Sequence, residues 1–386
     1  MAVKSGMRRS NFCSLSPTGG EGTDSRAPAD TLPLPPKGRR GAVRAKRVEG
    51  DGIQAEYERF HAASLPLDPP ELFLSFNRYF TEQQGWKAYA WLLDLAPIDL
   101  AGGIAVDIGC KYGHVTPLFF ARGACAACGI DVVDDYVDTA RRIVGAIYPA
   151  AHFAKSEAGY LPIAPDSVDL VLANEVISHV NPMYLPNLYC EIGRILRPGG
   201  VIVISDGNNI ANAACRQDLV NLYDAWENGP AGRSTGRDVV DEPFAELRRR
   251  LIAGRHPSMP DDTLDYLARH TSGLFGDYLM QIVDRYLAGG EFIERPYRRG
   301  ICPTNPLDGG AVMEFGFHPQ QVELELAAYG IAARQVFPDP EVDCSTAKRA
   351  LGTTFNLVRH RLRRLLGPAA SRAASWGFQI VGVKQG

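Results

Sequence analysis

Short apolar runs alternate with amphipathic stretches over residues 103–208. The runs are Ile104–Val106, Ala126–Ile130, Leu170–Leu172 and Val201–Ile204. Between them, apolar residues recur at helical spacing, as in residues 137–144. Strands that alternate with helices predict a parallel sheet with helices on both faces, and continuous apolar strands are typical of a sheet covered on both sides. The pattern therefore predicts a doubly wound α/β fold.

The flanking segments follow a different pattern. Helical spacing precedes the sheet at residues 71–76 and 86–93, and the alternation stops after Asn208 for about a hundred residues. Within that gap we expect helices at 261–268 and 278–288, and beyond it a helix at 320–329 and strands at 333–337 and 377–383. We divide the chain into a disordered basic tail (1–50), an N-terminal helical cap (51–98), a core (99–208), a helical insertion (209–311) and a C-terminal part of the core (312–386).

Bulk composition narrows the class of protein. The 386 residues are 45% hydrophobic and 22% charged, with a net charge of −3, which is ordinary for a globular chain and gives no sign of a nucleic-acid binder. No apolar run approaches the roughly 20 residues that cross a bilayer, and no secretory signal is evident. The eight cysteines are scattered and do not suggest a disulfide framework. We expect a cytoplasmic enzyme with free thiols.

Two segments are strongly basic. Residues 1–50 carry ten Lys or Arg against four acidic residues, with five prolines and few large apolar side chains, so we expect disorder. This tail could be passive or could contact an acidic partner. Residues 348–372 carry seven Lys or Arg and no acid, with apolar residues at helical spacing. Such a basic amphipathic helix can pack on the core or lie on an anionic membrane surface.

A glycine turn follows the first predicted strand. Asp107 precedes Gly109 and Gly113, and Asp131 follows Gly109 by 22 residues, at the end of the second strand. Such a turn lets a ligand approach the backbone, and an acid at that spacing accepts hydrogen bonds from ribose hydroxyls. A nicotinamide dinucleotide is one alternative. It fits less well, because an acid directly before the turn suits a cationic amine better than a pyrophosphate.

Further motifs follow in order along the chain. They are Gly129–Asp131, Glu157-Ala158, Asp166–Val171, Asn174–Val180 and Leu196–Gly200. Together with the glycine turn, this series resembles the class I S-adenosylmethionine-dependent methyltransferases, in particular their small-molecule branch. The resemblance covers residues 80–208 and, more loosely, 312–386. It implies a Rossmann-like, seven-stranded, mostly parallel sheet whose last strand is antiparallel.

The resemblance also implies roles for single residues in holding S-adenosylmethionine. Asp107 would lie near the methionine amino group, Gly109 and Gly113 would form the pocket floor, Asp131 would hold the ribose, Val132 and the Glu157-Ala158 pair would contact the adenine, and Asn174 would lie beside the reacting sulfur. Lys111 departs from the family pattern, which has glycine there. Its side chain could pair with the cofactor's carboxylate or could point to solvent.

The chemistry implied is in-line transfer of a methyl group to a small organic acceptor, for which alignment and a base both help. His179, after the fourth strand, is the first candidate base, although it could instead brace the next helix. Asp206, at the end of the fifth strand, is the second candidate. We expect the insertion at 209–311 to cover the acceptor. His114 is expected at the surface, and no metal site is expected.

Two other functions remain open at this point. A methyltransferase acting on protein or RNA would use the two basic segments, and a non-catalytic S-adenosylmethionine-binding protein would explain Lys111 in place of glycine. We favour the small-molecule enzyme, with no nucleic-acid partner and no transmembrane segment. Peripheral membrane contact remains possible, and the sequence leaves the oligomeric state open.

Overall fold

The computed structural model describes Leu32, residues 51–156, 159–230, 242–307 and 314–337, Val358, Leu365 and residues 367–386. Three expectations therefore lie outside the described residues: the disordered tail apart from Leu32, the Glu157-Ala158 pair, and most of the basic helix at 348–372.

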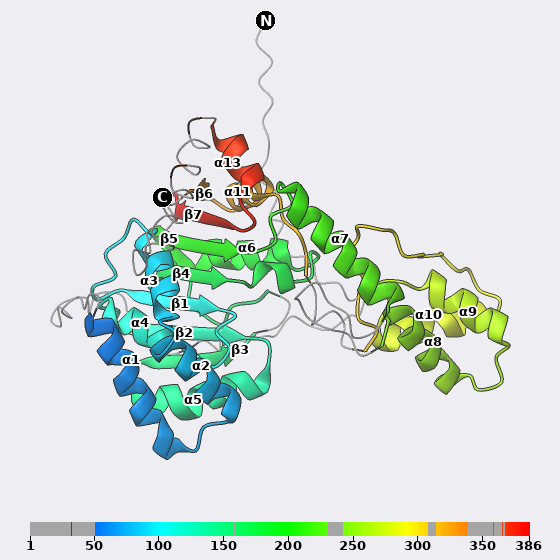
Figure 1. Ribbon diagram of the computed structural model, residues 1–386, viewed down its shortest axis with the longest axis horizontal. Coiled ribbons are helices and arrows are strands. Elements are labelled where there is room, and N and C mark those ends of the chain that lie inside the picture. The colour runs from blue at the N-terminus through cyan, green and yellow to red at the C-terminus, as the bar shows by residue number, and fades with distance from the viewer. Residues whose placement is uncertain are drawn as a thin grey trace, which may run out of the picture.

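A seven-stranded sheet forms the centre of the described structure (Figure 1). Its strands are β1 (Ile104–Ile108), β2 (Ala126–Asp131), β3 (Ala151–Lys155), β4 (Val168–Asn174), β5 (Leu196–Asp206), β6 (Ile331–Val336) and β7 (Phe378–Lys384). They lie in the order β3-β2-β1-β4-β5-β7-β6. β7 runs in the direction opposite to that of the other six strands of this sheet. The predicted doubly wound α/β sheet with an antiparallel last strand is confirmed.

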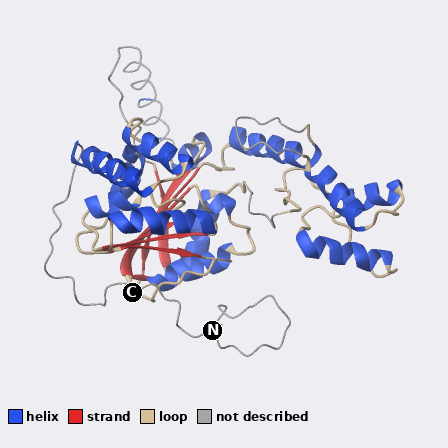
Figure 2. Cartoon of the chain, turned by 90° about the horizontal axis from the view of Figure 1, so that it is seen from below, coloured by secondary structure: helices blue, strands red, loops and turns tan. Residues whose placement is uncertain are grey.

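Helices cover both faces of the sheet, as Figure 2 shows. One face packs against α1 (Asp51–Ser64), α2 (Glu71–Thr81), α3 (Trp86–Asp94), α4 (Thr116–Ala121) and α5 (Asp134–Ile147), and the other against α6 (Leu185–Ile195) and α11 (Pro319–Ala328). Side chains alternate between the two layers along each strand, as strand geometry requires: Ala105 belongs to the first core and Val106 to the second. Both faces of β1 are therefore buried.

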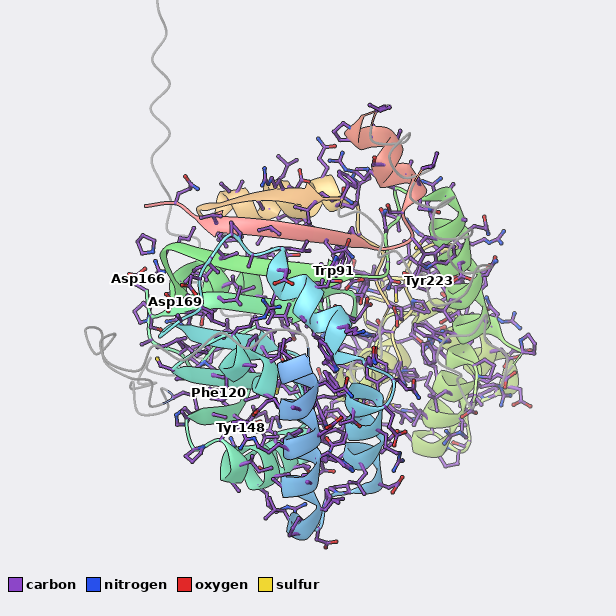
Figure 3. The ribbon with its side chains drawn as sticks, turned by 60° about the vertical axis from the view of Figure 1, so that its left-hand side comes forward. Trp91, Phe120, Tyr148, Asp166, Asp169 and Tyr223 are labelled. Atoms are coloured by element: carbon purple, nitrogen blue, oxygen red, sulfur yellow. The ribbon has the colours of Figure 1, made fainter. Side chains whose placement is uncertain are left out.

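The amino end of the sheet is fixed by a buried carboxylate. Asp169, labelled in Figure 3, is 3% exposed at the start of β4. One of its oxygens accepts a hydrogen bond from the Ile104 N–H at 2.9 Å, and the other pairs with the Arg197 guanidinium at 2.5 Å. These contacts tie β1, β4 and β5 together at the edge opposite their carboxyl ends, so the carboxyl edge is held in a fixed register.

The insertion after β5 leaves the sheet and returns to it. It contains α7 (Ala213–Asn228), α8 (Phe244–Arg255), α9 (Asp261–His270) and α10 (Gly276–Leu287). Asn212 caps α7 by accepting hydrogen bonds from the backbone N–H groups of Ala214 and Cys215. Beyond α7, the other three helices lie away from the sheet (Figures 1 and 2) around an apolar cluster of their own. The two ends of the insertion meet where Asn209 forms an isolated β-bridge with Phe317.

The remaining elements are a short helix, α13 (Pro368–Ala374), and the 3-10 turns η2 (Leu65–Leu67) and η3 (Ile177–His179). In the part of the chain that the structure describes, no helix has the length and apolar character of a membrane span. The expectation of free thiols is confirmed for Cys110, Cys125, Cys128, Cys215 and Cys302. It is wrong for Cys190, which is disulfide-bonded.

A buried ion pair joins the helices of the insertion and gives a testable prediction. Arg248 of α8 is fully buried, donates to the Ala268 carbonyl at 2.9 Å and pairs with Glu227 of α7, which is 2% exposed. Arg248→Ala leaves that carboxylate buried without its partner, so we expect a loss of about 3–5 kcal/mol in the free energy of unfolding, measured by urea denaturation.

Arg249→Ala is the matched control. Arg249 pairs with Asp261 and Asp265 but is 40% exposed, and exposed pairs contribute little to stability. Its unfolding curve should stay close to that of the parent. Equal effects of the two substitutions would contradict a structural role for the buried pair.

Candidate functional site

The turn after β1 has an unusual backbone. Gly109, Lys111 and Gly113 have φ angles of +72°, +48° and +77°. A Cβ on Gly109 would lie 2.4 Å from the Val176 Cγ2, and one on Gly113 would lie 2.6 Å from the Phe153 ring. Glycine is therefore required at both positions, for the backbone angle and for the close approach.

Asp131 holds this turn from the end of β2. One of its carboxylate oxygens accepts a hydrogen bond from the Lys111 N–H at 2.9 Å, and the other accepts one from the Val133 N–H at 3.1 Å. The Gly109 N–H donates to the Ile130 carbonyl at 2.7 Å. The turn keeps its shape although Lys111 replaces glycine, because these bonds fix its left-handed backbone.

The side chain of Lys111 is accessible to solvent, and its pairing with the cofactor's carboxylate stays a prediction. The residue is exposed, and its Nζ lies 4.5 Å from the centre of the Phe76 ring and 6.0 Å from that of Tyr136. An ammonium over an aromatic face is attracted by the ring's electron density. Lys111 therefore bridges α2 and α5 across the rim of the turn.

A cavity of about 760 Å³ opens at the carboxyl edge of the sheet. Of the predicted site residues, it is lined by Asp107, Gly109, Lys111, Asp131, Val132, Asn174 and His179. Gly113 and Asp206 do not line it. Glu157 and Ala158 lie outside the described residues, although Ser156 and Gly159 on either side of them are part of the cavity wall.

Asp107 is a buried acid at the centre of this wall. It is 4% exposed, and burial together with the charge of Asp131 raises its pKa from 3.8 to about 8. A carboxylate in such a place favours a cation, because a nearby positive charge offsets the loss of hydration. The site therefore suits a ligand that presents an ammonium or sulfonium group.

An aromatic wall faces the acidic edge of the cavity. Phe76 and Phe80 come from α2 and Tyr89 from α3. The Asn174 side-chain amide lies 3.4 Å from the Tyr89 hydroxyl, and burial together with the Asp107 charge raises the pKa of that phenol. Phe76 and Tyr89 lie in the helical stretches predicted at residues 71–76 and 86–93, whereas Phe80 lies beyond the first of them. Nothing in their spacing indicates that these side chains face a ligand.

His114 is part of the cavity lining, and its predicted surface position is wrong. It is 4% exposed, its Nε2 lies 3.2 Å from the Phe73 carbonyl, and its ring lies 4.4 Å from the Phe73 ring. Burial lowers the pKa of His114 to about 3, so the ring is neutral near pH 7. The aromatic side chains of α2 cover it, and the sequence around His114 alone gives no sign of them.

Three titratable side chains gather beyond the carboxyl end of β4. Glu175 and His179 line the cavity, and the His179 Nε2 lies 3.9 Å from a carboxylate oxygen of Glu314. The other oxygen of Glu314 accepts a hydrogen bond from the Asn208 amide at 2.5 Å. The sequence analysis did not identify Glu175 or Glu314. Glu175 could have been predicted from its place in the sequence, because it is an acid that directly follows Asn174 at the end of a predicted strand.

The Asp206 side chain is buried and is hydrogen-bonded to the backbone. It is 1% exposed, and its two carboxylate oxygens accept hydrogen bonds from the backbone N–H groups of Ser178 and Asn208 at 3.1 and 3.0 Å. Burial raises its pKa, while these hydrogen bonds act in the opposite direction. Asp206 therefore positions η3, which carries His179, and does not itself face the cavity.

The described residues of the insertion do not contribute to the cavity wall. The wall comes from α2, α3, the glycine turn, Tyr136 of α5, the sheet edge and residues 156–188, and no described residue of 209–307 takes part. The expected covering of the acceptor by this insertion stays a prediction. Within the described residues, no group of three or more His, Cys, Asp or Glu side chains is arranged to hold a metal ion.

Comparison with known proteins connects this site to a chemistry. Residues 106–204, which contain the turn and β4, match the family described as a methyltransferase domain. A phthiotriol/phenolphthiotriol dimycocerosates methyltransferase of Mycobacterium ulcerans is 30% identical over 206 residues, which cover 52% of this chain and 68% of that protein.

Two further relatives share a shorter part of their length. The biotin biosynthesis bifunctional protein BioHC of Cellvibrio japonicus is 34% identical over 181 residues, 43% of this chain and 33% of that protein. A malonyl-acyl-carrier-protein O-methyltransferase of Serratia marcescens is 25% identical over 182 residues, 46% of this chain and 65% of that protein. The chain thus spans less than two thirds of either of these relatives.

The buried acid generates a prediction about stability. Asp107 has a pKa of about 8 in the folded chain against 3.8 as its ordinary value, so the folded chain keeps a proton that the unfolded chain releases. This contribution to stability is full below about pH 4 and is lost as the pH rises to about 8. Asp107→Asn removes the penalty, so the ligand-free variant should be more stable than the parent at pH 8, on the order of 1–3 kcal/mol.

Urea denaturation at about pH 4 and pH 8 measures this difference, which should shrink towards zero at the lower pH. Asp138→Asn, at an exposed acid of α5, should match the parent at both values. An Asp107→Asn variant no more stable than the parent at pH 8 would contradict the unfavourable burial of this carboxylate.

Proposed function

Because this chain belongs to the class I S-adenosylmethionine-dependent methyltransferases, we propose that it transfers a methyl group to a small organic acceptor held in the cavity. One observation carries the proposal. A single cavity of about 760 Å³ runs from the acids Asp107 and Asp131 to the aromatic wall of α2 and α3, so cofactor and acceptor can meet inside it.

The residues of the acidic edge fit the cofactor. The Asp131 carboxylate retains acceptor capacity for two ribose hydroxyls, because each of its oxygens accepts only one backbone hydrogen bond. Asp107 offers a buried negative charge to the methionine ammonium, and Val132, 60% exposed, offers an apolar surface to the adenine. Bound there, S-adenosylmethionine supplies a methyl group on a cationic sulfur for in-line displacement by the acceptor.

The acceptor end is apolar and of limited size. Phe76, Phe80 and Tyr89 enclose it on one side, and His179 lies at its polar end. This arrangement supports a small acceptor that carries an apolar or aromatic part. A macromolecular acceptor remains the alternative, because one relative acts on a malonyl group that an acyl-carrier protein presents.

Calorimetry with S-adenosylmethionine and an assay for S-adenosylhomocysteine test the proposal together. We expect binding of the cofactor, and turnover with small acceptors but not with acyl-carrier protein, RNA or protein fractions. Turnover confined to those macromolecules would replace the small-molecule proposal. Cofactor binding with no turnover on either panel would favour a binding protein without catalysis.

Asp131→Ala should weaken the binding of S-adenosylmethionine by roughly 1.5–3 kcal/mol, because it removes a charged hydrogen-bond acceptor from the ribose. Calorimetry measures the loss, and circular dichroism checks that the variant is folded. Asp134→Ala, three residues along and paired with Lys155 at the surface, is the matched control and should bind as the parent does. Equal affinity of the Asp131 variant and the parent would refute the assignment of the ribose site.

A further inference from the structure

Glu175 has a backbone conformation that a side chain rarely adopts. It directly follows Asn174, the last residue of β4, and its φ angle is +52°. Left-handed backbone at a residue other than glycine is uncommon and often marks a functional position. The Glu175 N–H donates to the Ser205 carbonyl at 2.8 Å, which holds this conformation in place.

The Glu175 carboxylate is oriented by β5. Its Oε2 accepts a hydrogen bond from the Gly207 N–H at 3.1 Å, and a Cβ at Gly207 would lie 3.3 Å from the same oxygen. The absence of a side chain at Gly207 therefore lets the carboxylate pack against the backbone. Among the described residues, no hydrogen bond to the Oε1 of Glu175 is found, and the residue lines the cavity.

The position of Glu175 is close to the cofactor turn. Val176, the next residue, packs so tightly against Gly109 that a Cβ on that glycine would lie 2.4 Å from the Val176 Cγ2. On the other side, Asn174 reaches the Tyr89 hydroxyl of the aromatic wall. Glu175 therefore lies between the turn that we assign to the cofactor and the compartment that we assign to the acceptor.

Electrostatics give this carboxylate the character of a base near neutral pH. Solvent reaches it through the open cavity, yet the surrounding protein raises its pKa to about 7. Burial is the main cause, followed by the charge of Asp206, with a smaller contribution from Glu314, while the Gly207 hydrogen bond and His179 act in the opposite direction. A general base works best when its pKa lies near the working pH.

We propose that Glu175 is the general base of the reaction and that the acceptor presents a hydroxyl group. The inference rests on the proposed function. The hydroxyl oxygen forms a bond to the methyl carbon as the sulfur–methyl bond breaks, and the hydroxyl proton passes to Glu175 and then to water. Glu175 and Glu314 also make an anionic acceptor unfavourable at this end, because like charges repel.

The first test asks whether Glu175 lies close to the sulfonium of the bound cofactor, and it needs no acceptor. The affinities of S-adenosylmethionine and S-adenosylhomocysteine are compared between about pH 6 and pH 8.5, because the two differ in the sulfonium charge and share the ammonium that Asp107 faces. An ionised Glu175 favours the sulfonium. The preference for S-adenosylmethionine should therefore rise roughly tenfold as the pH passes about 7, for a coupling of one pKa unit.

Glu175→Gln keeps an acceptor for the Gly207 N–H and removes the charge, so the preference should become independent of pH. Glu246→Gln makes the same change in net charge on an exposed residue of α8 and should leave the pH dependence intact. A pH-independent preference in the parent overturns the placement of Glu175, and so does a pH-dependent preference that survives in Glu175→Gln. Absence of any cofactor binding would instead refute the proposed function itself.

The second test measures the contribution of Glu175 to the rate of methyl transfer. The probes are catechol, 1-octanol and benzylamine. We expect methylation of a hydroxyl probe, a rate that falls below about pH 7, and a loss of roughly 10²–10⁴-fold in Glu175→Gln when S-adenosylmethionine is saturating. His179→Gln is the rival variant. A larger loss in His179→Gln than in Glu175→Gln, methylation of benzylamine alone, or no methylation of a hydroxyl probe overturns the proposal.

Discussion

The buried carboxylate of Asp107 is the constraint around which the site is organised. It lies at 4% exposure on β1, close enough to Asp131 that the charge of Asp131 raises its pKa further. The sheet keeps Asp107 in this position because β1 is hydrogen-bonded to β2 on one side and to β4 on the other. A shift of β1 by one residue would break both sets of hydrogen bonds. A positively charged ligand would offset the loss of hydration that raises the pKa of Asp107.

The glycine turn extends this constraint to the helices. Asp131 fixes the backbone of Lys111, and three residues further on His114 is enclosed by aromatic rings of α1 and α2, with Phe73 nearest. The Tyr57 hydroxyl donates to the His114 carbonyl at 3.3 Å. The turn and the N-terminal helices therefore pack as one unit, and the aromatic wall of the cavity is anchored to the glycine turn.

The sequence predicted the sheet well, because apolar runs report burial on both faces directly. It also placed Asp107, Asp131, Asn174 and His179 at one edge, since parallel strands bring their carboxyl ends together. The sequence did not predict features that depend on tertiary contacts. His114 is buried by helices distant in the chain, and both carboxylate oxygens of Asp206 accept hydrogen bonds from backbone N–H groups. The sequence did not predict Glu175 as a site residue, because its left-handed backbone and its raised pKa arise only in the folded structure.

The closure of the insertion at Asn209 and Phe317 has an evolutionary consequence. The Phe317 N–H donates to the Asn208 carbonyl, and the Ile210 N–H donates to the Phe317 carbonyl, so the excursion leaves and rejoins the sheet at one point. A segment whose two ends meet can be lengthened, exchanged or lost without shifting the strands on either side. The helices between these ends can therefore diversify without displacing the strands whose carboxyl ends line the cavity.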